Sequence, residues 1–221
     1  MSFGDVLIDH IGKTRDFPTQ SALTGLLANA LGWRRTDHQL LQELQDRLIF
    51  AARIERDSDR MTDTQNAKLE KSDKGWTTWG EPEGRDGASY GAPHRRYRDY
   101  LMDARVSVVL TLSSEDQTLN TGALERAFAY PARPLFIGRK PCLPSKPLYR
   151  GIVNAENAYQ ALIKLPGKTK LRAVWPIDNG PGDGTQVYRV IGVADKRRWP
   201  QGLHGGRRKL VEGVIIPEKM L

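Results

Sequence analysis

The chain has 221 residues, of which 39% are hydrophobic and 27% are charged, a composition typical of a globular protein rather than a disordered one. The formal net charge of +8 and the sequence pI of about 9.7 favour an anionic partner, nucleic acid before membrane, over a merely basic surface. Cys142 is the single cysteine, which excludes an internal disulfide and a zinc site built on cysteines.

The apolar runs are short. Residues 106–112, among the longest, fall far short of a membrane span, and residues 1–16 lack the charged and apolar regions of a signal peptide. We therefore expect a cytoplasmic protein with no membrane partner. The histidines are not spaced as metal ligands, and no phosphate-binding loop of the Walker type is present. We expect no metal and no cofactor.

Apolar residues at three- and four-residue spacing predict a short buried helix over residues 21–31. Thr19 or Ser21 is expected to cap its start, and Gly32 provides the left-handed stop. Gly25 is a small position at which a neighbouring strand could approach closely. Because the helix is short, packing must stabilise it.

A second helix is predicted over residues 37–47, with Thr36 as its cap. Its inner face is expected to carry Leu40, Leu41, Leu44 and Leu48. Residues 49–56 then read as a strand in which Phe50, Ala52 and Ile54 alternate with Ala51, Arg53 and Glu55.

A further strand is predicted over residues 105–112 and a helix over residues 122–130. This order of strands and helices favours an α+β domain with helices packed on one face of a sheet. In the remainder of the chain we expect a helix over residues 155–165 and strands over residues 171–175, 186–193 and 209–216.

Large apolar residues are scarce between residues 57 and 93, so this segment cannot bury a core of its own. It is either a disordered insertion or an extended arm that a partner orders. The second alternative is favoured because Trp76, Trp79 and Tyr90 are unusual in a linker. Such aromatic side chains can stack on bases or fill a pocket of a protein partner.

Two basic clusters are candidate nucleic-acid surfaces. His94 precedes a run of arginines and tyrosines, which favours a backbone clamp first, a solvated edge second and metal-independent RNA cleavage by acid–base catalysis third. Residues 195–209 hold the second cluster, which is either a nucleic-acid surface or a solvated hairpin tip.

Four separated segments occur in a characteristic order: residues 17–35, 63–66, 97–104 and 134–144. Together they resemble the CasD family, the subunit of type I-E CRISPR Cascade complexes that grips the 5′ handle of the guide RNA. Any one of these segments alone is a weak signal, whereas the ordered combination is specific.

The resemblance implies an α+β fold with a ferredoxin-like (RAMP/RRM-like) domain over residues 1–150, a thumb inserted at about residues 57–99, and a smaller β-rich C-terminal part over residues 151–221. It implies a non-catalytic RNA-binding subunit that caps the guide RNA, docks against the large and backbone subunits, and meets target DNA only through the complex. The alternative is a metal-independent endoribonuclease that processes CRISPR repeat RNA with His94.

The resemblance also implies where the RNA lies. Arginine and lysine side chains after the first helix and in residues 134–144 would hold phosphates, main-chain amides near the first helix start would add an anion site, and the arm would press between the handle and the first guide bases. The implied RNA-binding residues are Thr19, Gln20, Ser21, Arg34, Arg35, Trp76, Arg95, Arg96, Arg98, Arg139 and Lys140.

Family members begin with an apolar strand that leads into a Ser-Phe-Gly-like turn, and this chain starts at that turn, at Ser2. We therefore expect the first strand of the ferredoxin-like sheet to be missing. An open sheet edge exposes unpaired backbone groups, which predicts poor solubility of the isolated chain.

Overall fold

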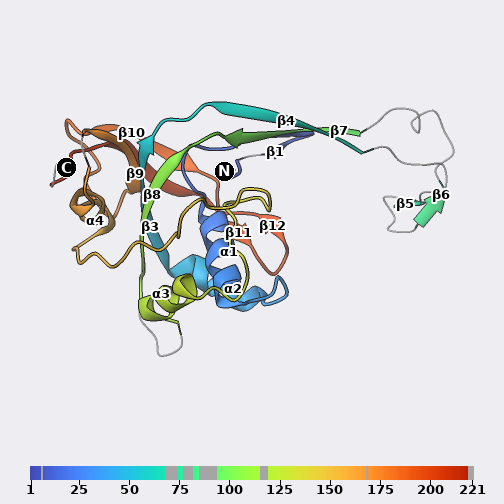
Figure 1. Cartoon of the computed structure of the whole chain (residues 1–221), viewed down its shortest axis with the longest axis horizontal. Helices are drawn as coiled ribbons and strands as arrows, with labels where there is room; N and C mark the ends of the chain where they lie inside the picture. Colours follow the sequence, from blue (N-terminus) through green and yellow to red (C-terminus); the bar gives the residue numbers. More distant parts are fainter. Residues whose placement is uncertain are drawn as a thin grey trace.

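The computed structural model describes residues 1–5, 7–67, 74–76, 82–84, 94–114, 119–167 and 169–218. At its centre lies a five-stranded antiparallel sheet with strand order β10-β13-β9-β3-β8 (Figure 1). Its strands are β3 (Leu48–Arg56), β8 (Arg105–Leu112), β9 (Leu171–Pro176), β10 (Val187–Val193) and β13 (Arg208–Ile215). The fold is therefore mixed α/β, and strands from both sides of residue 150 share one sheet.

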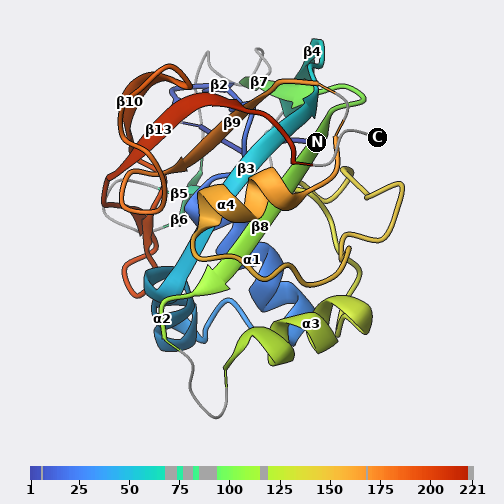
Figure 2. The same cartoon turned by 90° about the vertical axis from the view of Figure 1, so that its left-hand side faces the viewer.

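Helices cover both faces of this sheet. One face packs against α1 (Gln20–Leu31), α2 (His38–Arg47) and α3 (Thr121–Ala129), as expected for the first part of the chain. The other face is covered by α4 (Ala158–Lys164), which Figure 2 shows crossing the sheet in front of β3 and β8. The expectation of helices on one face alone is therefore wrong for the sheet as a whole.

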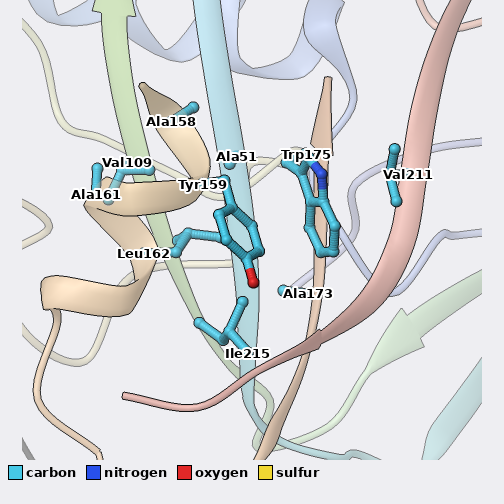
Figure 3. Packing of buried hydrophobic residues seen from close by; sticks show 10 residues of the cluster. All are labelled: Ala51, Val109, Ala158, Tyr159, Ala161, Leu162, Ala173, Trp175, Val211 and Ile215. Atoms are coloured by element: carbon cyan, nitrogen blue, oxygen red, sulfur yellow. The ribbon is translucent and has the colours of Figure 1, made fainter. Parts of the chain in front are cut away.

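The α4 face has an aromatic centre. The rings of Tyr159 and Trp175 pack with their centroids 4.7 Å apart, and Leu162 is buried in the same cluster (Figure 3). The indole Nε1–H of Trp175 donates a hydrogen bond of 3.0 Å to the carbonyl oxygen of Pro181, so the buried polar group of this ring has a partner.

Two adjacent strands of the sheet, β3 and β8, are continuous with a ribbon. β4 (Arg60–Ala67) follows β3, β7 (His94–Leu101) leads into β8, and the two pair over their full length, running away from the body in Figure 1. β7 also pairs in parallel with β2 (Ile11–Gly12), which pairs with β1 (Leu7–Ile8). For residues 60–67 neither a disordered insertion nor an arm ordered by a partner describes the structure, because these residues pair with β7 of the same chain.

Two small hairpins complete the described structure. β5 (Lys74–Trp76) pairs with β6 (Pro82–Gly84), and β11 (Arg197–Arg198) pairs with β12 (Leu203–His204). Within the basic cluster, residues 197–204 therefore form a hairpin, and residues 208–209 begin β13. Among the described residues, no helix is long and apolar enough to cross a membrane.

The N-terminal residues lie beside the ribbon and outside the central sheet. The amide of Leu101 donates to the carbonyl oxygen of Met1 over 2.8 Å, and the amide of Ser2 donates to that of Ile137 over 3.2 Å. Within the described residues β8 is an outer strand of the sheet. Poor solubility of the isolated chain stays a prediction.

The sequence pattern predicted the first two helices, but it named the wrong cap for α2 and wrongly placed Leu40 on its buried face. The side chain of Thr19 caps α1 and Gly32 ends it with a φ of 82°, as expected. The cap of α2 is Asp37 instead of Thr36, and the Asp37 carboxylate accepts a hydrogen bond from the amide of Arg34 at 2.6 Å. Leu40 is 43% exposed, because α2 buries only part of its leucine face.

The buried guanidinium of Arg53 ties β3 to the end of α4. Only 2% of this residue is exposed, and it donates to the carbonyl oxygens of Leu162, Leu165 and Pro166 over 2.7–3.2 Å and to the carboxylate of Glu55 over 2.7 Å. Both faces of β3 are consequently buried. Alternation along the strand did not reveal this, because the partners lie more than a hundred residues away.

Arg53→Ala should lower the free energy of unfolding by about 3–5 kcal/mol, because it leaves the Glu55 carboxylate and the α4 carbonyl oxygens without a buried donor. Urea denaturation followed by circular dichroism measures this change. Arg105→Ala, which removes an exposed arginine from the neighbouring strand, is the control and should change stability by no more than about 0.5 kcal/mol. Equal losses for the two variants would contradict a structural role for Arg53.

Candidate nucleic-acid interface

A groove of about 280 Å³ lies between α1, the N-terminal residues and the 134–144 loop. We call it the α1 groove. On the helix side it is lined by Ser21, Ala22, Gly25, Leu26 and Asn29. On the opposite side lie residues 2–4 with Phe136, Gly138 and Arg139. Two segments that the sequence singled out, more than a hundred residues apart, therefore meet at one site.

The groove is open because the outer face of α1 carries small side chains. A Cβ at Gly25 would meet none of the described residues within 4 Å, so none of the described strands packs closely against this position, contrary to expectation. The opposite side of the helix is fixed by Gln20, whose side-chain amide donates to the carbonyl oxygens of Gln45 and Leu48 over 2.8 and 2.9 Å. The helix thus presents a rigid, unoccupied face.

Gly138 sets the position of the opposite wall. Its φ of 84° lies in the left-handed region, and a Cβ there would fall on the carbonyl oxygen of Ser2. The turn around it is closed by hydrogen bonds of 2.8 Å between residues 137 and 142 and between residues 142 and 139. Asn29 attaches the same loop to α1 by donating to the carbonyl oxygen of Pro134 over 2.9 Å.

Arg139 connects the groove to the base of the ribbon. Its guanidinium lies 4.8 Å from the ring centroid of Tyr100 and donates to the carbonyl oxygen of Asp99 over 3.5 Å. A Cβ at Gly12 would lie 3.1 Å from Arg98 Cδ and 3.2 Å from Arg139 Nη2, so both arginines pack against this glycine. Two predicted RNA-binding arginines are thereby brought together.

Arg96 lies on the same strand, two residues before Arg98, so the two side chains share a face of the ribbon. Its guanidinium donates to the carbonyl oxygen of Asp9 over 3.4 Å. The hydrogen bond and positive charge of His10 lower the pKa of the Asp9 carboxyl from its ordinary value. An ionised carboxylate therefore borders this basic face, and Arg95 points to the opposite face.

The expected anion site at the start of α1 is already filled by the protein itself. The carboxylate of Asp195 accepts a hydrogen bond from the amide of Gln20 over 2.9 Å, and its carbonyl oxygen accepts one from the amide of Ser21 over 3.0 Å. The side chains of Thr19 and Gln20 are buried and hydrogen bonded within the fold. Of the three predicted residues, Ser21 alone lines the groove, and the anion-site prediction is wrong.

The predicted phosphate-binding cations do not form a single cluster. Arg139 lines the α1 groove, whereas Arg34 and Arg35 follow the opposite, C-terminal end of α1 and do not line it. Lys140 is exposed on the 134–144 loop. The helix α1 separates the two pairs, and the prediction that each of the four holds phosphate stays a prediction.

The remaining predicted contacts belong to the arm. Trp76 is in β5, opposite Pro82, and His94 is the first residue of β7, opposite Ala67. Trp79 and Tyr90 lie outside the described residues.

Comparison with known proteins identifies the family. The profile described as CRISPR-associated protein (Cas_Cas5) matches residues 1–211, so the chain belongs to this family of CRISPR-associated proteins. The curated protein "CRISPR system Cascade subunit CasD" of Escherichia coli strain K12 is 29% identical over 162 residues, which are 73% of this chain and 70% of that protein. The predicted resemblance is thereby confirmed.

Solved structures agree on the fold. A chain of a "CRISPR RNA-guided surveillance complex" superposes with a TM-score of 0.66 at 21% identity, covering 98% of this chain and 90% of the other. A chain titled "Crystal structure of Cas protein" superposes with a TM-score of 0.59 at 25% identity, covering 99% of this chain and 91% of the other.

Sequence reasoning missed several groove residues, notably Asn29 and Phe136. Asn29 is one turn beyond Gly25 on the same helix face, so extending the small-residue stripe by four positions would have found it. Phe136 carried a weaker signal, as an aromatic residue next to the basic turn at Arg139.

Gly138→Ala should lower the free energy of unfolding by at least about 2 kcal/mol, because the new Cβ meets backbone in a left-handed conformation. Thermal and urea denaturation measure the loss. The control is Gly182→Ala, whose Cβ would make an ordinary 3.6 Å contact with Ile177, and which should be close to neutral. Unchanged stability of the Gly138 variant would show that the loop does not close on Ser2 as described.

Proposed function

We propose that this protein is a non-catalytic subunit of a type I-E CRISPR Cascade complex and that it binds the 5′ handle of the guide RNA in the α1 groove. The observation that carries the proposal is the α1 groove itself, an open helix face whose opposite wall bears Arg139 next to the ribbon arginines. The family membership and the similarity to the E. coli Cascade subunit CasD support the assignment to Cascade.

The chemistry of the groove suits single-stranded RNA. Splayed bases are read by stacking and edge contacts, whereas phosphates are held by cations. Three residues in the lining of the α1 groove suit these contacts. Phe136 offers a ring for stacking, Ser21 offers a hydroxyl for hydrogen bonds, and Arg139 offers a guanidinium for a phosphate. Gly25 lets an RNA backbone come close to the helix.

The same proposal places the protein between other subunits. The β4–β7 ribbon projects beyond the body in Figure 1 and carries basic residues on β7, so it extends the cationic surface away from the groove. We infer that the ribbon lies along the guide RNA as a thumb and that the body docks against the large and backbone subunits. Target DNA then meets the protein only through the assembled complex.

Gly25→Gln should abolish most RNA binding while leaving the fold intact. The Gln side chain starts from a Cβ position that meets none of the described residues within 4 Å and extends from the groove lining. Replacing a helical glycine by glutamine also stabilises α1 by about 0.5–1 kcal/mol. We expect the affinity for guide RNA, measured by fluorescence anisotropy, to fall at least about tenfold, or 1.4 kcal/mol.

Gly192→Gln is the matched control for this variant. Gly192 lies on β10, away from the groove, and a Cβ there also meets nothing within 4 Å. This variant should bind RNA like the unmodified protein. Undiminished RNA binding by a stable Gly25→Gln protein would refute the groove as the handle site.

The protein should leave CRISPR repeat RNA intact. In the presence of a metal chelator, prolonged incubation with a labelled repeat hairpin should give no product on a denaturing gel. Cleavage that disappears in His94→Ala would instead establish the endoribonuclease alternative.

A further inference from the structure

A second pocket, of about 200 Å³, lies between the start of α2 and the β11–β12 hairpin. It is lined by Arg35, His38, Arg197 and Trp199 together with residues 200–202. It shares no residue with the α1 groove, and the proposed function does not use it. We call it the hairpin pocket.

The pocket is preformed, because α2 fixes the hairpin. The side chain of Gln45, 1% exposed, accepts from the amide of Arg197 and donates to its carbonyl oxygen, each over 2.9 Å. The amide of Trp199 donates to the side-chain oxygen of Gln42 over 3.1 Å. The indole Nε1–H of Trp199 donates to Gln45 over 3.2 Å, so the ring is held in place.

Two nitrogen atoms of the lining lack a hydrogen-bond partner within the described part of the chain. They are Nδ1 of His38 and Nε of Arg197, and both are buried. Arg197 Nη2 does donate, to the carbonyl oxygen of Gly202 over 2.8 Å, so the guanidinium is positioned but only partly satisfied. Buried polar atoms without partners are rare in native folds, and Nε–H is a donor that needs an acceptor.

The charge around the pocket favours an anionic ligand. Among the described residues, no carboxylate forms an ion pair with the cations at or next to its lining, which are Arg34, Arg35, Lys196, Arg197, Arg198 and Arg207. The guanidinium of Arg197 lies 5.3 Å from the ring centroid of Trp199, so a cation and an aromatic surface adjoin. This excess of positive charge disfavours a cationic ligand.

We propose that the hairpin pocket binds one nucleotide of a single-stranded RNA. The phosphate lies between Arg35 and Arg197, and the base packs beside the stacked Arg197 and Trp199 side chains. The small volume fits one such unit better than a whole drug-sized molecule. An acidic side chain of a protein partner would satisfy the charges but would leave the aromatic surface unused.

The decisive comparison is Arg35→Ala against Arg105→Ala. Both residues are exposed and carry one charge, but only Arg35 lines the pocket, whereas Arg105 lies on β8. Affinity for a fluorescein-labelled uridine oligomer would be measured by anisotropy over a series of salt concentrations. We expect Arg35→Ala to weaken binding about tenfold and to reduce the salt slope by about 0.7, the value for one phosphate of a single strand.

Arg105→Ala should weaken binding less than about twofold. Equal losses of RNA affinity in the two variants would show that the pocket is only part of a diffuse basic surface, and this result would overturn the proposal. Unchanged RNA affinity in Arg35→Ala, with loss of co-purified protein subunits, would assign the pocket to an acidic protein partner and also overturn it.

A second measurement separates this proposal from the proposed function. RNA containing 4-thiouridine is crosslinked to the protein by light, and the attachment sites are mapped by mass spectrometry. Crosslinks at Trp199 or its hairpin neighbours are expected in the unmodified protein and also in Gly25→Gln, since the two sites are separate. Crosslinks confined to the α1 groove would leave the proposed function standing and refute the hairpin pocket.

Discussion

The buried carboxylate of Asp195 is the interaction on which the arrangement of both sites depends. It is 3% exposed, it receives the first amide of α1, and it pairs with Arg208 at the start of β13 over 2.8–3.1 Å. The guanidinium of Arg208 lies in turn 4.3 Å from the ring centroid of Phe50 on β3. One buried ion pair therefore fixes the start of α1 relative to the sheet and to the hairpin that follows Asp195.

The α1 groove and the hairpin pocket belong to one rigid framework. Gln20, at the start of α1, donates to the carbonyl oxygen of Gln45, and the Gln45 side chain holds the hairpin. These hydrogen bonds join α1, α2 and β11 without a flexible connection between them. Because the framework is already ordered, binding of a ligand at either site would cost little conformational entropy of the protein. This preorganisation favours specific recognition.

Sequence patterns predicted the structural features that neighbouring residues determine. They failed for the features that residues distant in the sequence determine. The cap at Thr19 and the stop at Gly32 were predictable because each acts on neighbouring residues. The anion site failed because its amides are taken by Asp195, 175 residues from Gln20, and the burial of Arg53 was hidden for the same reason. The basic hairpin was recognised as a charge cluster, but the pocket that it lines together with His38 depends on packing that no local pattern records.

The topology also constrains when these sites can form during synthesis. β3 becomes an inner strand only when β9 pairs beside it through Ala52 and Val174. The amides of Gln20 and Ser21 gain their acceptor only when Asp195 has been made. Such distant contacts form slowly, and until then the incomplete sheet exposes apolar surface to the cell. A ribosome-bound chain that has reached β8 therefore holds most of the α1 groove sequence without the groove, so a ligand of the groove can bind only after the later segments have been made.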